Sequence, residues 1–394
     1  MKTKWVICSG PDWYRPSVSS TEQLIERFYA DGYKVLWMNP VAFRSPFSGT
    51  APAKSAWKKV ADKAKTHLRF LRREKRDFWI WVPVYLPSFG RQGERLNRLL
   101  VGTQLQLLKI FFRIRLNRTV VWYAPGGSAI HLLRLNSRLK VYEAHDLLSD
   151  FRTESVELKT SLRQKETMLC ERADLIFAAS EGIRNKLLKM APSKQVYLLH
   201  HGVDYDHFSA DGQVHVDLLK IRQMGRPVAG YFGSLSDAND KEALLALADN
   251  GFSVVLIGKA LGDYTALEAH PNVFFTGPVD YRILPEYARG FDVGLLNWRP
   301  GEWIENCFPV KALEYLASGL PVVSCPIPVL QQHYADVIAF ARSPAEFLSQ
   351  CRKAIEENSD VLRQIRRERV RDCSWDHRYR FVKDLMNECR VLPD

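Results

Sequence analysis

The chain has 394 residues, of which 46% are hydrophobic and 25% are charged, which is typical of a folded globular protein and excludes a disordered one. This length is more than one core usually supports, so we expect two domains of about 200 residues each. The seven cysteines form no CxxC pair, and no apolar run reaches the roughly 18 residues of a membrane span. These features argue against structural zinc, a disulfide framework and an integral membrane protein.

The net charge of +12 is concentrated in one part of the chain. Residues 58–118 hold 16 Lys and Arg against 4 Asp and Glu, so the remainder is close to neutral. A basic block of this kind predicts an anionic partner, either nucleic acid or an anionic membrane surface. The sequence contains no helix-turn-helix, zinc-finger, RNP or KH pattern, so we expect no nucleic-acid partner.

The first half of the chain alternates predicted strands and helices. Residues 5–10 predict a strand, residues 21–32 predict an amphipathic helix, and residues 34–40 predict the next strand. Short apolar strands with polar or small residues at their carboxyl ends are expected further along, at 119–125, 140–146 and 174–180. Such alternation predicts a parallel α/β sheet with right-handed connections.

Two basic amphipathic helices are predicted among these strands. Over residues 54–76, apolar side chains from Trp57 to Leu71 recur at helical spacing and cations cover the rest. We interpret this segment as a helix that lies on an anionic membrane, because basic amphipathic helices beside Trp and Phe suit the lipid interface. A second helix is expected over residues 91–114, either as an ordinary domain helix or as a second membrane-surface helix. Its apolar stripe consists of Leu96, Leu99, Leu100, Leu107, Ile110, Phe111 and Ile114.

The strand–helix pattern restarts after a turn-rich stretch near residues 209–226. Strands are predicted at 227–233, 253–259, 272–277, 291–296 and 321–325. The fold class is therefore α/β, with two doubly wound, Rossmann-like domains. In open sheets of this kind ligands bind beyond the carboxyl ends of the strands, so two such domains are expected to form a cleft.

A Lys–Glu pair stands in the segment ENCFPVKALEYLASGLPVVS, residues 305–324. Pro309 suits the beginning of a helix, which places Lys311 and Glu314 one turn apart on one face. A helix N-terminus with a lysine favours bound phosphate, and a carboxylate one turn deeper can accept two hydrogen bonds from a ribose diol. The spacing alone is equally compatible with an ordinary surface ion pair.

The segment PVKALEYLASGLPVVS resembles the nucleotide-binding segment of GT-B glycosyltransferases, in particular family 4-like enzymes and related bacterial polysaccharide glycosyltransferases. Further stretches resemble the same family in the same order. They are DLIFAASEGIRNKL, VYLLHHGVDYDHF, VAGYFGSL and NVFFTGPVDYRILPEYARGFDVGLL, with SWDHRYRFVKDL near the end of the chain. The resemblance covers about residues 140–330.

The resemblance implies a set of donor-binding residues. Glu314 would bind the ribose and Lys311 the diphosphate, on a helix supported by Pro309 and Tyr315. Gly233 and Ser234 would approach the phosphates, and Gly277 and Val279 would line the base pocket. The chain departs from the family at Asn306, where many members have a glutamate, and it lacks the Arg and Lys that commonly follow the FvGR strand.

Candidate reaction residues lie in the first half. His145 and Asp146 end the strand of KVYEAHD, which resembles the family's vyd.Hd segment. A carboxylate there can remove a proton from an acceptor hydroxyl, and a histidine can instead hydrogen-bond the donor sugar. A structural interpretation, in which the pair caps the following helix, stays open. Asp12 and Trp13, in the loop after the first strand, are candidates for contact with the acceptor.

The resemblance implies three regions: an acceptor-side domain over residues 1–205 with the basic helices within 54–118, a nucleotide-sugar domain over 206–375, and a helix over 376–394 that packs back on the first domain. It also implies a glycosyltransferase without metal or cofactor. The scattered cysteines favour a reducing cytosol, and the basic helices predict peripheral attachment to the inner face of the cell membrane. The enzyme would move a hexose or uronic acid from a nucleoside-diphosphate sugar, expected to be UDP-linked, to a membrane-associated, lipid-linked or glycan acceptor in bacterial surface polysaccharide synthesis. The alternatives are a sugar-nucleotide epimerase of the same fold and a non-catalytic membrane-associated subunit.

Overall fold

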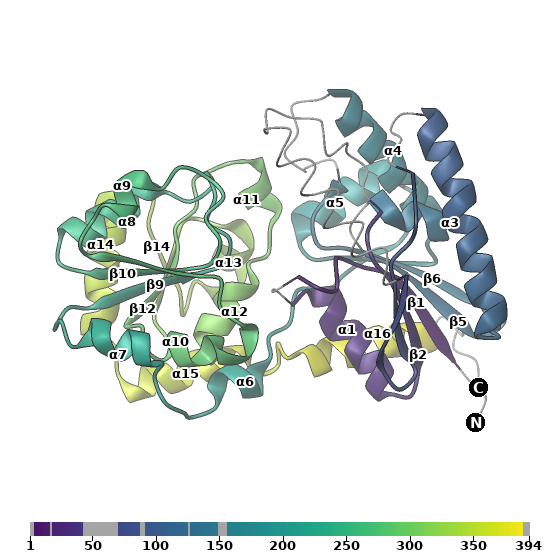
Figure 1. Ribbon diagram of the computed structural model, residues 1–394. Helices are drawn as coiled ribbons and strands as arrows, with labels where there is room; N and C mark the ends of the chain where they lie inside the picture. Colours follow the sequence, from purple (N-terminus) through teal and green to yellow (C-terminus); the bar gives the residue numbers. More distant parts are fainter. Residues whose placement is uncertain are drawn as a thin grey trace. The chain divides into compact units, whose positions relative to one another are not determined.

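The computed structural model describes residues 4–15, 18–41, 70–86, 91–124, 127–148 and 156–388. These residues form two compact units (Figure 1). Unit 1 consists of Met1–Arg15, Ser19–Leu199 and Tyr379–Asp394, and unit 2 consists of Pro16–Val18 and His200–Arg378. Each unit is built around its own sheet and core, which confirms the expected fold class of two α/β, Rossmann-like domains.

Unit 1 contains an eight-stranded sheet in the order β3-β4-β2-β1-β5-β6-β7-β8. Its strands are β1 (Trp5–Ser9), β2 (Lys34–Met38), β3 (Leu71–Lys75), β4 (Phe78–Trp81), β5 (Thr119–Tyr123), β6 (Leu139–Ala144), β7 (Leu175–Ala178) and β8 (Val196–Leu198). All neighbours are parallel except β3 and β4, which form an antiparallel hairpin. The order of the strands reverses between β1 and β5, which is where open sheets of this type bind ligands.

Helices cover the sheet of unit 1, and the central strands β1, β2, β5 and β6 are buried along almost their whole length. They are α1 (Ser20–Ala30), α3 (Arg91–Phe111), α4 (Val156–Arg172) and α5 (Glu181–Met190), with 3-10 turns at Leu116–Arg118 and Gly127–Leu132. The N-terminus of α1 is fixed by a capping box, in which Ser19 accepts from the Glu22 amide and Glu22 accepts from the Ser19 amide.

The predicted helix over residues 54–76 is wrong at its carboxyl end. Residues 54–69 lie outside the described residues, but Leu71–Lys75 form strand β3, paired with β4 through a turn in which Asp77 has a φ of 63°. In this register Leu71 lies opposite Trp81, and the Arg73 guanidinium lies 5.6 Å from the centre of the Trp79 ring. Pairing with the aromatic strand β4 therefore outweighs the helical spacing of the apolar residues.

The predicted helix over residues 91–114 is confirmed as α3, but its predicted stripe is not the buried face. The core-facing residues are Val101, Leu105 and Leu108. Most of the stripe is exposed, as described below for Leu96, Leu99, Leu107, Ile110 and Phe111. Hydrophobic spacing identified the helix, but α3 carries apolar residues on two faces, and spacing alone does not say which one is covered.

Unit 2 contains a six-stranded parallel sheet in the order β11-β10-β9-β12-β13-β14. Its strands are β9 (Val228–Phe232), β10 (Ser253–Ile257), β11 (Val273–Gly277), β12 (Val293–Leu296), β13 (Val322–Ser324) and β14 (Ala339–Phe340). The order of the strands reverses between β9 and β12. The helices are α6 (Tyr205–Ser209), α7 (Val216–Arg222), α8 (Lys241–Asp249), α9 (Thr265–Glu268), α10 (Leu284–Ala288), α11 (Glu302–Asn306), α12 (Val310–Ala317), α13 (Pro328–Tyr334), α14 (Pro344–Glu356) and α15 (Asp360–Arg371).

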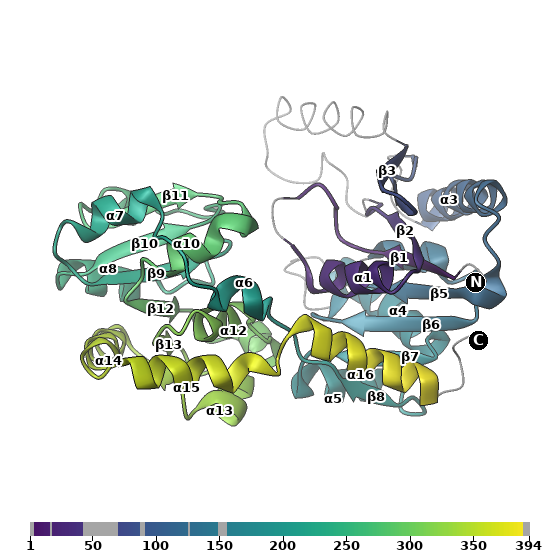
Figure 2. The same ribbon diagram turned by 90° about the horizontal axis from the view of Figure 1, so that it is seen from below.

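The last helix, α16 (Trp375–Glu388), begins in unit 2 and continues in unit 1. Figure 2 shows its yellow ribbon alongside the elements of unit 1. Asp31, at the end of α1, accepts hydrogen bonds from the Tyr379 hydroxyl at 2.8 Å and from the Lys383 ammonium at 2.5 Å. The Tyr379 ring packs edge-on against Phe28, with ring centres 4.9 Å apart. From Tyr379 onward, α16 is thus part of unit 1.

We expect Asp31→Asn to loosen α16 locally. Burial raises the pKa of the Asp31 carboxyl, but the hydrogen bonds from Lys383 and Tyr379 outweigh it, so the pKa is lowered overall. A lowered carboxyl pKa contributes stability above the ordinary value of about 4, and that stability is lost at lower pH. Because the group is partly exposed, the effect is about 1 kcal/mol or less at neutral pH.

Amide hydrogen exchange in residues 379–388 would measure this effect. Exchange in the Asn variant should be several-fold faster at pH 7, and the difference should shrink as the pH falls below about 4. Asp360→Asn, at the exposed first turn of α15, serves as the control. Equal exchange rates in the two variants at pH 7 would contradict the anchoring role of Asp31.

Candidate functional site

Strands β9 and β12 separate at the point where the strand order of unit 2 reverses. The two strands pair only at Val293 with Ala229 and at Gly294 with Gly230, after which β12 continues beside β13. The Tyr315 hydroxyl accepts the backbone N–H of Phe232 at 3.1 Å and contacts the Gly230 carbonyl at 3.4 Å. A side chain from α12 thus replaces a bond of the strand ladder, and it fixes α12 beside the end of β9.

Tyr315 requires a small residue beside it. A Cβ built on Gly294 would lie 2.7 Å from the Tyr315 ring, so a larger residue on β12 would displace the ring. Tyr315 is fully buried, and burial holds the pKa of its phenol well above the ordinary value. Its side chain therefore supports α12 rather than lying where a ligand could touch it.

Lys311 lies one turn before Tyr315, and its ammonium is held at the carboxyl end of β9. Its Nζ donates to the Tyr231 hydroxyl at 2.9 Å. It also lies 4.5 Å from the centre of the Tyr231 ring and 4.8 Å from that of Trp298, distances typical of cation–π contacts. Burial raises the pKa of the Tyr231 phenol, but the charge and hydrogen bond of Lys311 lower it overall. The cation is thus positioned by aromatic groups.

Gly233 leaves the space that the Lys311 side chain occupies. Its φ is 130°, and a Cβ at this position would lie 2.4 Å from Lys311 Cε. A Cβ on Gly258, at the end of β10, would lie 2.0 Å from the Gly233 carbonyl oxygen. The loops after β9 and β10 therefore contact each other through backbone atoms, with no side chain between them. Ser234 follows in the same loop, and its carbonyl accepts from the Tyr231 hydroxyl at 3.1 Å.

Glu314 is the buried carboxylate of this group. Only 6% of the residue is exposed, and burial raises the pKa of its carboxyl to about 7. The positive charge of Lys311 and a hydrogen bond from Tyr281 act in the opposite direction, and the negative charge of Asp204 adds to the rise. A carboxylate desolvated beside a cation is typical of a binding or catalytic site.

The predicted Asn306 and Pro309 lie at the entrance to α12. Asn306 ends α11, where its side-chain amide donates to the Glu302 carbonyl at 2.6 Å and the residue is 9% exposed. Pro309 is the N-cap of α12 in an extended conformation, and no side chain caps the helix. The backbone N–H groups of the first turn of α12 therefore have no side-chain cap, and they lie close to Lys311. This arrangement favours the binding of an anion.

Gly277 and Val279 follow the edge strand β11. Gly277 ends the strand with a φ of 71°, and its carbonyl accepts the backbone N–H of Gly258 at 2.9 Å. Val279 is half-buried and packs against the core of unit 2. Together with Gly233 and Gly258, these residues place the carboxyl ends of β9, β10 and β11 along one edge of the sheet.

In unit 1, His145 is oriented by a buried acid that was not among the predicted residues. The Glu143 carboxylate lies 2.5 Å from His145 Nε2, and its other oxygen accepts from Trp122 Nε1 at 2.7 Å and Thr21 Oγ1 at 3.0 Å. Glu143 is 3% exposed. An acidic residue inside the apolar strand VYEA was the signal that could have identified it, because a buried charge requires partners.

The remaining predicted site residues of unit 1 are Asp146 and, in the loop after β1, Asp12 and Trp13. Asp146 is exposed, next to the half-buried His145. In the loop after β1, Asp12 accepts from the side-chain amide of Asn39 at 2.9 Å, and the Trp13 amide donates to the Asn39 side chain at 3.1 Å. The Trp13 ring packs against Trp37, with centres 5.1 Å apart. The buried Asn39 thus fixes this loop to the end of β2.

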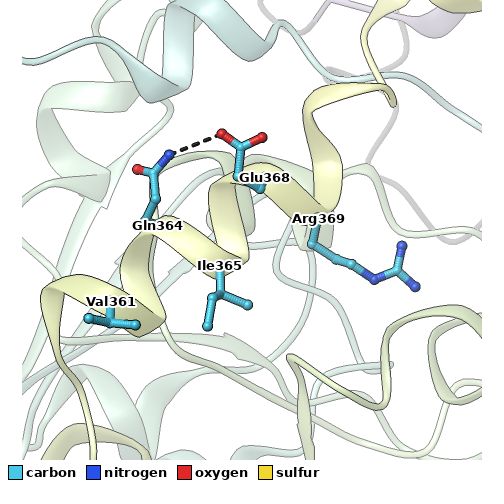
Figure 3. Close-up of a pocket in the computed structure, with 5 residues that line it drawn as sticks. All are labelled: Val361, Gln364, Ile365, Glu368 and Arg369. Carbon is cyan, nitrogen blue, oxygen red and sulfur yellow. Dashed lines mark hydrogen bonds between the residues drawn. The ribbon is translucent and has the colours of Figure 1, made fainter.

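The described residues contain no group of three His, Cys, Asp or Glu side chains that could hold a metal ion. A shallow hollow of unit 2 lies along α15 and is lined by Val361, Gln364, Ile365, Glu368 and Arg369 (Figure 3). Its lining is largely hydrocarbon, and Gln364 donates to Glu368 at 3.0 Å. The polar and charged groups that could bind a ligand lie instead at the ends of β9 and β12.

Comparison with known proteins shows which family this chain is similar to. Residues 226–357, which include Lys311 and Glu314, match the family described as glycosyl transferases group 1. The chain is 29% identical over 289 residues to the putative teichuronic acid biosynthesis glycosyltransferase TuaH of Bacillus subtilis (strain 168). That alignment covers 67% of this chain and 71% of the relative.

Solved structures show the same fold at low sequence identity. Sucrose-phosphate synthase from Thermosynechococcus elongatus superposes with a TM-score of 0.70 and 14% identity, covering 100% of both chains. Anabaena HepE, solved in complex with UDP and glucose, has a TM-score of 0.68 and 16% identity, covering 98% of this chain and 100% of HepE. At these identities the likeness concerns the fold.

We expect Glu314→Gln to stabilise the protein at alkaline pH. The carboxyl pKa is about 7 in the folded state against about 4.5 in an exposed carboxyl, so the folded protein binds the proton more tightly. Stability contributed by this group is present below about pH 4.5 and is lost as the pH rises through 7. The penalty at pH 8 is on the order of 2–3 kcal/mol, and the amide does not carry it.

Urea unfolding at pH 5 and pH 8 would test this expectation. The Gln variant should gain stability relative to the unmodified protein mainly at pH 8. The control is Glu305→Gln, at an exposed position on α11. A loss of stability in the Glu314 variant at pH 8 would show that the ionised carboxylate stabilises the fold.

Proposed function

We propose that the chain is a group 1 glycosyltransferase of GT-B fold. It would transfer a hexose or uronic acid from a UDP-sugar to a lipid-linked acceptor during synthesis of a bacterial surface polysaccharide. The observation that carries the proposal is the Lys311–Glu314 pair at the strand reversal of unit 2. TuaH is named for teichuronic acid biosynthesis and HepE binds UDP and glucose, which supports the choice of donor and product class.

Lys311 is proposed to hold the departing diphosphate. An ammonium has three N–H donors, and Tyr231 accepts one of them. The bare backbone at Gly233 and the first amides of α12 would let phosphate oxygens approach closely. As the bond between the sugar and the diphosphate breaks, negative charge accumulates on the leaving group, and fixed cations and N–H donors lower the barrier.

Glu314 is proposed to bind the ribose of the donor. An ionised carboxylate accepts two hydrogen bonds, which matches the two hydroxyls of a ribose. Ribose binding would compensate for the burial of the charge, because the diol would provide hydrogen-bond donors in addition to Tyr281. Gly277 and Val279, at the end of β11, are proposed to contact the base.

The reaction centre is proposed to use His145 or Asp146 of unit 1. The transfer forms a bond between the acceptor oxygen and the anomeric carbon, and the acceptor hydroxyl loses its proton. Asp146 is exposed and could accept that proton. His145, oriented by Glu143, could instead hydrogen-bond the donor sugar. Asp12 and Trp13 are proposed to contact the acceptor.

An anionic membrane surface is proposed as the place where the enzyme meets its acceptor, on the cytoplasmic side. In the described part of the chain, no helix has the length and apolar character needed to cross a bilayer. The basic block of residues 58–118 would be attracted to anionic lipid. This attachment is peripheral, and it would bring the site to a lipid-linked acceptor.

Calorimetric titration with UDP and a panel of nucleotide sugars tests the donor site. We expect UDP-sugars to bind, Lys311→Ala to weaken binding about tenfold or more, and Glu314→Ala to weaken binding of the ribose-containing ligands similarly, since each removes a charged hydrogen-bond partner. The control is Lys353→Ala, on an exposed part of α14. Unchanged affinity in both site variants would refute the donor-site assignment, and release of an epimerised donor without acceptor would favour an epimerase.

We also expect Glu143→Gln to lower kcat at least tenfold, because a neutral amide would hold the His145 ring less firmly than the carboxylate does. A pH profile of kcat together with a titration with UDP separates this role from a structural one. The profile should change shape in the Gln variant, while the affinity for UDP, which carries no transferable sugar for His145 to contact, stays the same. A parallel loss of UDP binding would indicate that Glu143 acts mainly on folding.

A further inference from the structure

Helix α3 has an apolar row on its outer side in addition to its buried face. The row consists of Leu96, Leu99, Leu107, Ile110 and Phe111, which are 53%, 65%, 62%, 71% and 71% exposed. The spacing follows one side of an α-helix, and the row is about 22 Å long at 1.5 Å per residue. We call these five residues the outer row. Figure 1 shows α3 as a long helix on the outside of unit 1.

The orientation of α3 prevents the outer row from turning inward. Val101, Leu105 and Leu108 are buried in the core of unit 1 on another face. The Asn97 side chain exchanges two hydrogen bonds with the backbone of Leu86, at 2.7 and 2.9 Å. The Gln104 side chain does the same with the backbone of Val84, at 2.9 and 2.6 Å. The helix is thus fixed in rotation, and burying the outer row within unit 1 would break these contacts.

Cations flank the outer row, and its own positions are uncharged. Residues 91–118 contain seven Arg and Lys and a single acidic residue, Glu94. Glu94 is engaged by Lys165, whose Nζ lies 2.6 Å from its carboxylate. Arg95, Arg113 and Arg115 are exposed around the helix. The surface therefore combines exposed hydrocarbon with a net positive charge.

This combination fits an anionic lipid bilayer better than a second copy of the chain. Two copies joined through the outer row would bring two strongly positive helices together, which costs electrostatic energy. An anionic lipid surface neutralises the same charges, and its acyl boundary accepts the apolar side chains. The exposed Val84 and Leu86, in the loop that Asn97 and Gln104 fix, add hydrocarbon beside the helix.

We propose that α3 binds an anionic bilayer with its axis parallel to the membrane, with the outer row inserted at the headgroup–acyl boundary and the flanking arginines on lipid phosphates. The proposal rests on the proposed function only in taking the membrane as the site of the acceptor. It assigns attachment to a described helix and to insertion of apolar side chains, in addition to the charge attraction of the basic block.

Flotation of the full chain with vesicles tests the proposal. The vesicles would contain phosphatidylcholine alone or phosphatidylcholine with phosphatidylglycerol. The row variant carries Leu99→Ser, Leu107→Ser and Ile110→Ser, and the charge variant carries Arg95→Gln, Arg113→Gln and Arg115→Gln. The matched control carries Val216→Ser, Leu219→Ser and Met224→Ser, three exposed apolar residues at or near α7 of unit 2.

The unmodified protein and the control should float with the anionic vesicles. The row variant should lose binding at least tenfold at low and at high salt, and the charge variant should lose mainly the binding seen at low salt. In a Leu107→Trp variant, brominated acyl chains should quench the fluorescence beyond that of the unmodified protein. This added quenching would report insertion directly.

Three outcomes would overturn the proposal: no vesicle binding by the unmodified protein, unchanged binding by the row variant, or a fall in molecular mass of the row variant that reveals a dimer through α3. Donor titration on the same samples keeps the proposals apart. Intact UDP-sugar binding with no flotation would reject the α3 surface alone, and flotation without UDP-sugar binding would reject the proposed function alone.

Discussion

The separation of β9 from β12 is the constraint on which the donor side of the molecule depends. Parallel strands normally continue their ladder of hydrogen bonds, and an unpaired N–H in a core is costly. Here the Phe232 N–H finds its partner in the Tyr315 hydroxyl, so the gap between the strands is filled by a side chain of α12. The same helix carries Lys311 one turn earlier and Glu314 beside it. The defect in the sheet and the position of the two charged groups thus have a common origin.

This arrangement stores unfavourable energy at the site. Glu314 is buried where an ionised carboxylate is poorly solvated, and Gly233 and Gly258 keep backbone conformations that other residues rarely adopt. Groups held in this way are prepared for a ligand that supplies what the protein lacks, such as hydroxyl donors for the carboxylate and an anion for the ammonium. The surrounding core of unit 2 provides the stability that offsets the cost of burying the Glu314 carboxylate.

The sequence predicted what depends on short-range pattern. Apolar runs ending in small or polar residues identified most strands of both sheets, and the Pro309–Lys311–Glu314 spacing placed a helix that the structure contains. The sequence pattern was insufficient where contacts with residues far away in the chain determine the structure. Leu71–Lys75 pair with an aromatic strand, and the covered face of α3 is chosen by loop 82–86 and by the core. Tyr231, Trp298 and Glu143 were missed because their importance lies in contacts with residues far away in sequence.

The hydrogen bond between Lys383 and Asp31 joins residues 352 positions apart. Unit 1 is therefore discontinuous in the chain, whereas His200–Arg378 supplies nearly all of unit 2 in one piece. During synthesis on the ribosome, all of unit 2 therefore emerges before the segment that completes unit 1. The surface of unit 1 that receives α16 stays uncovered until residues 379–388 have been made.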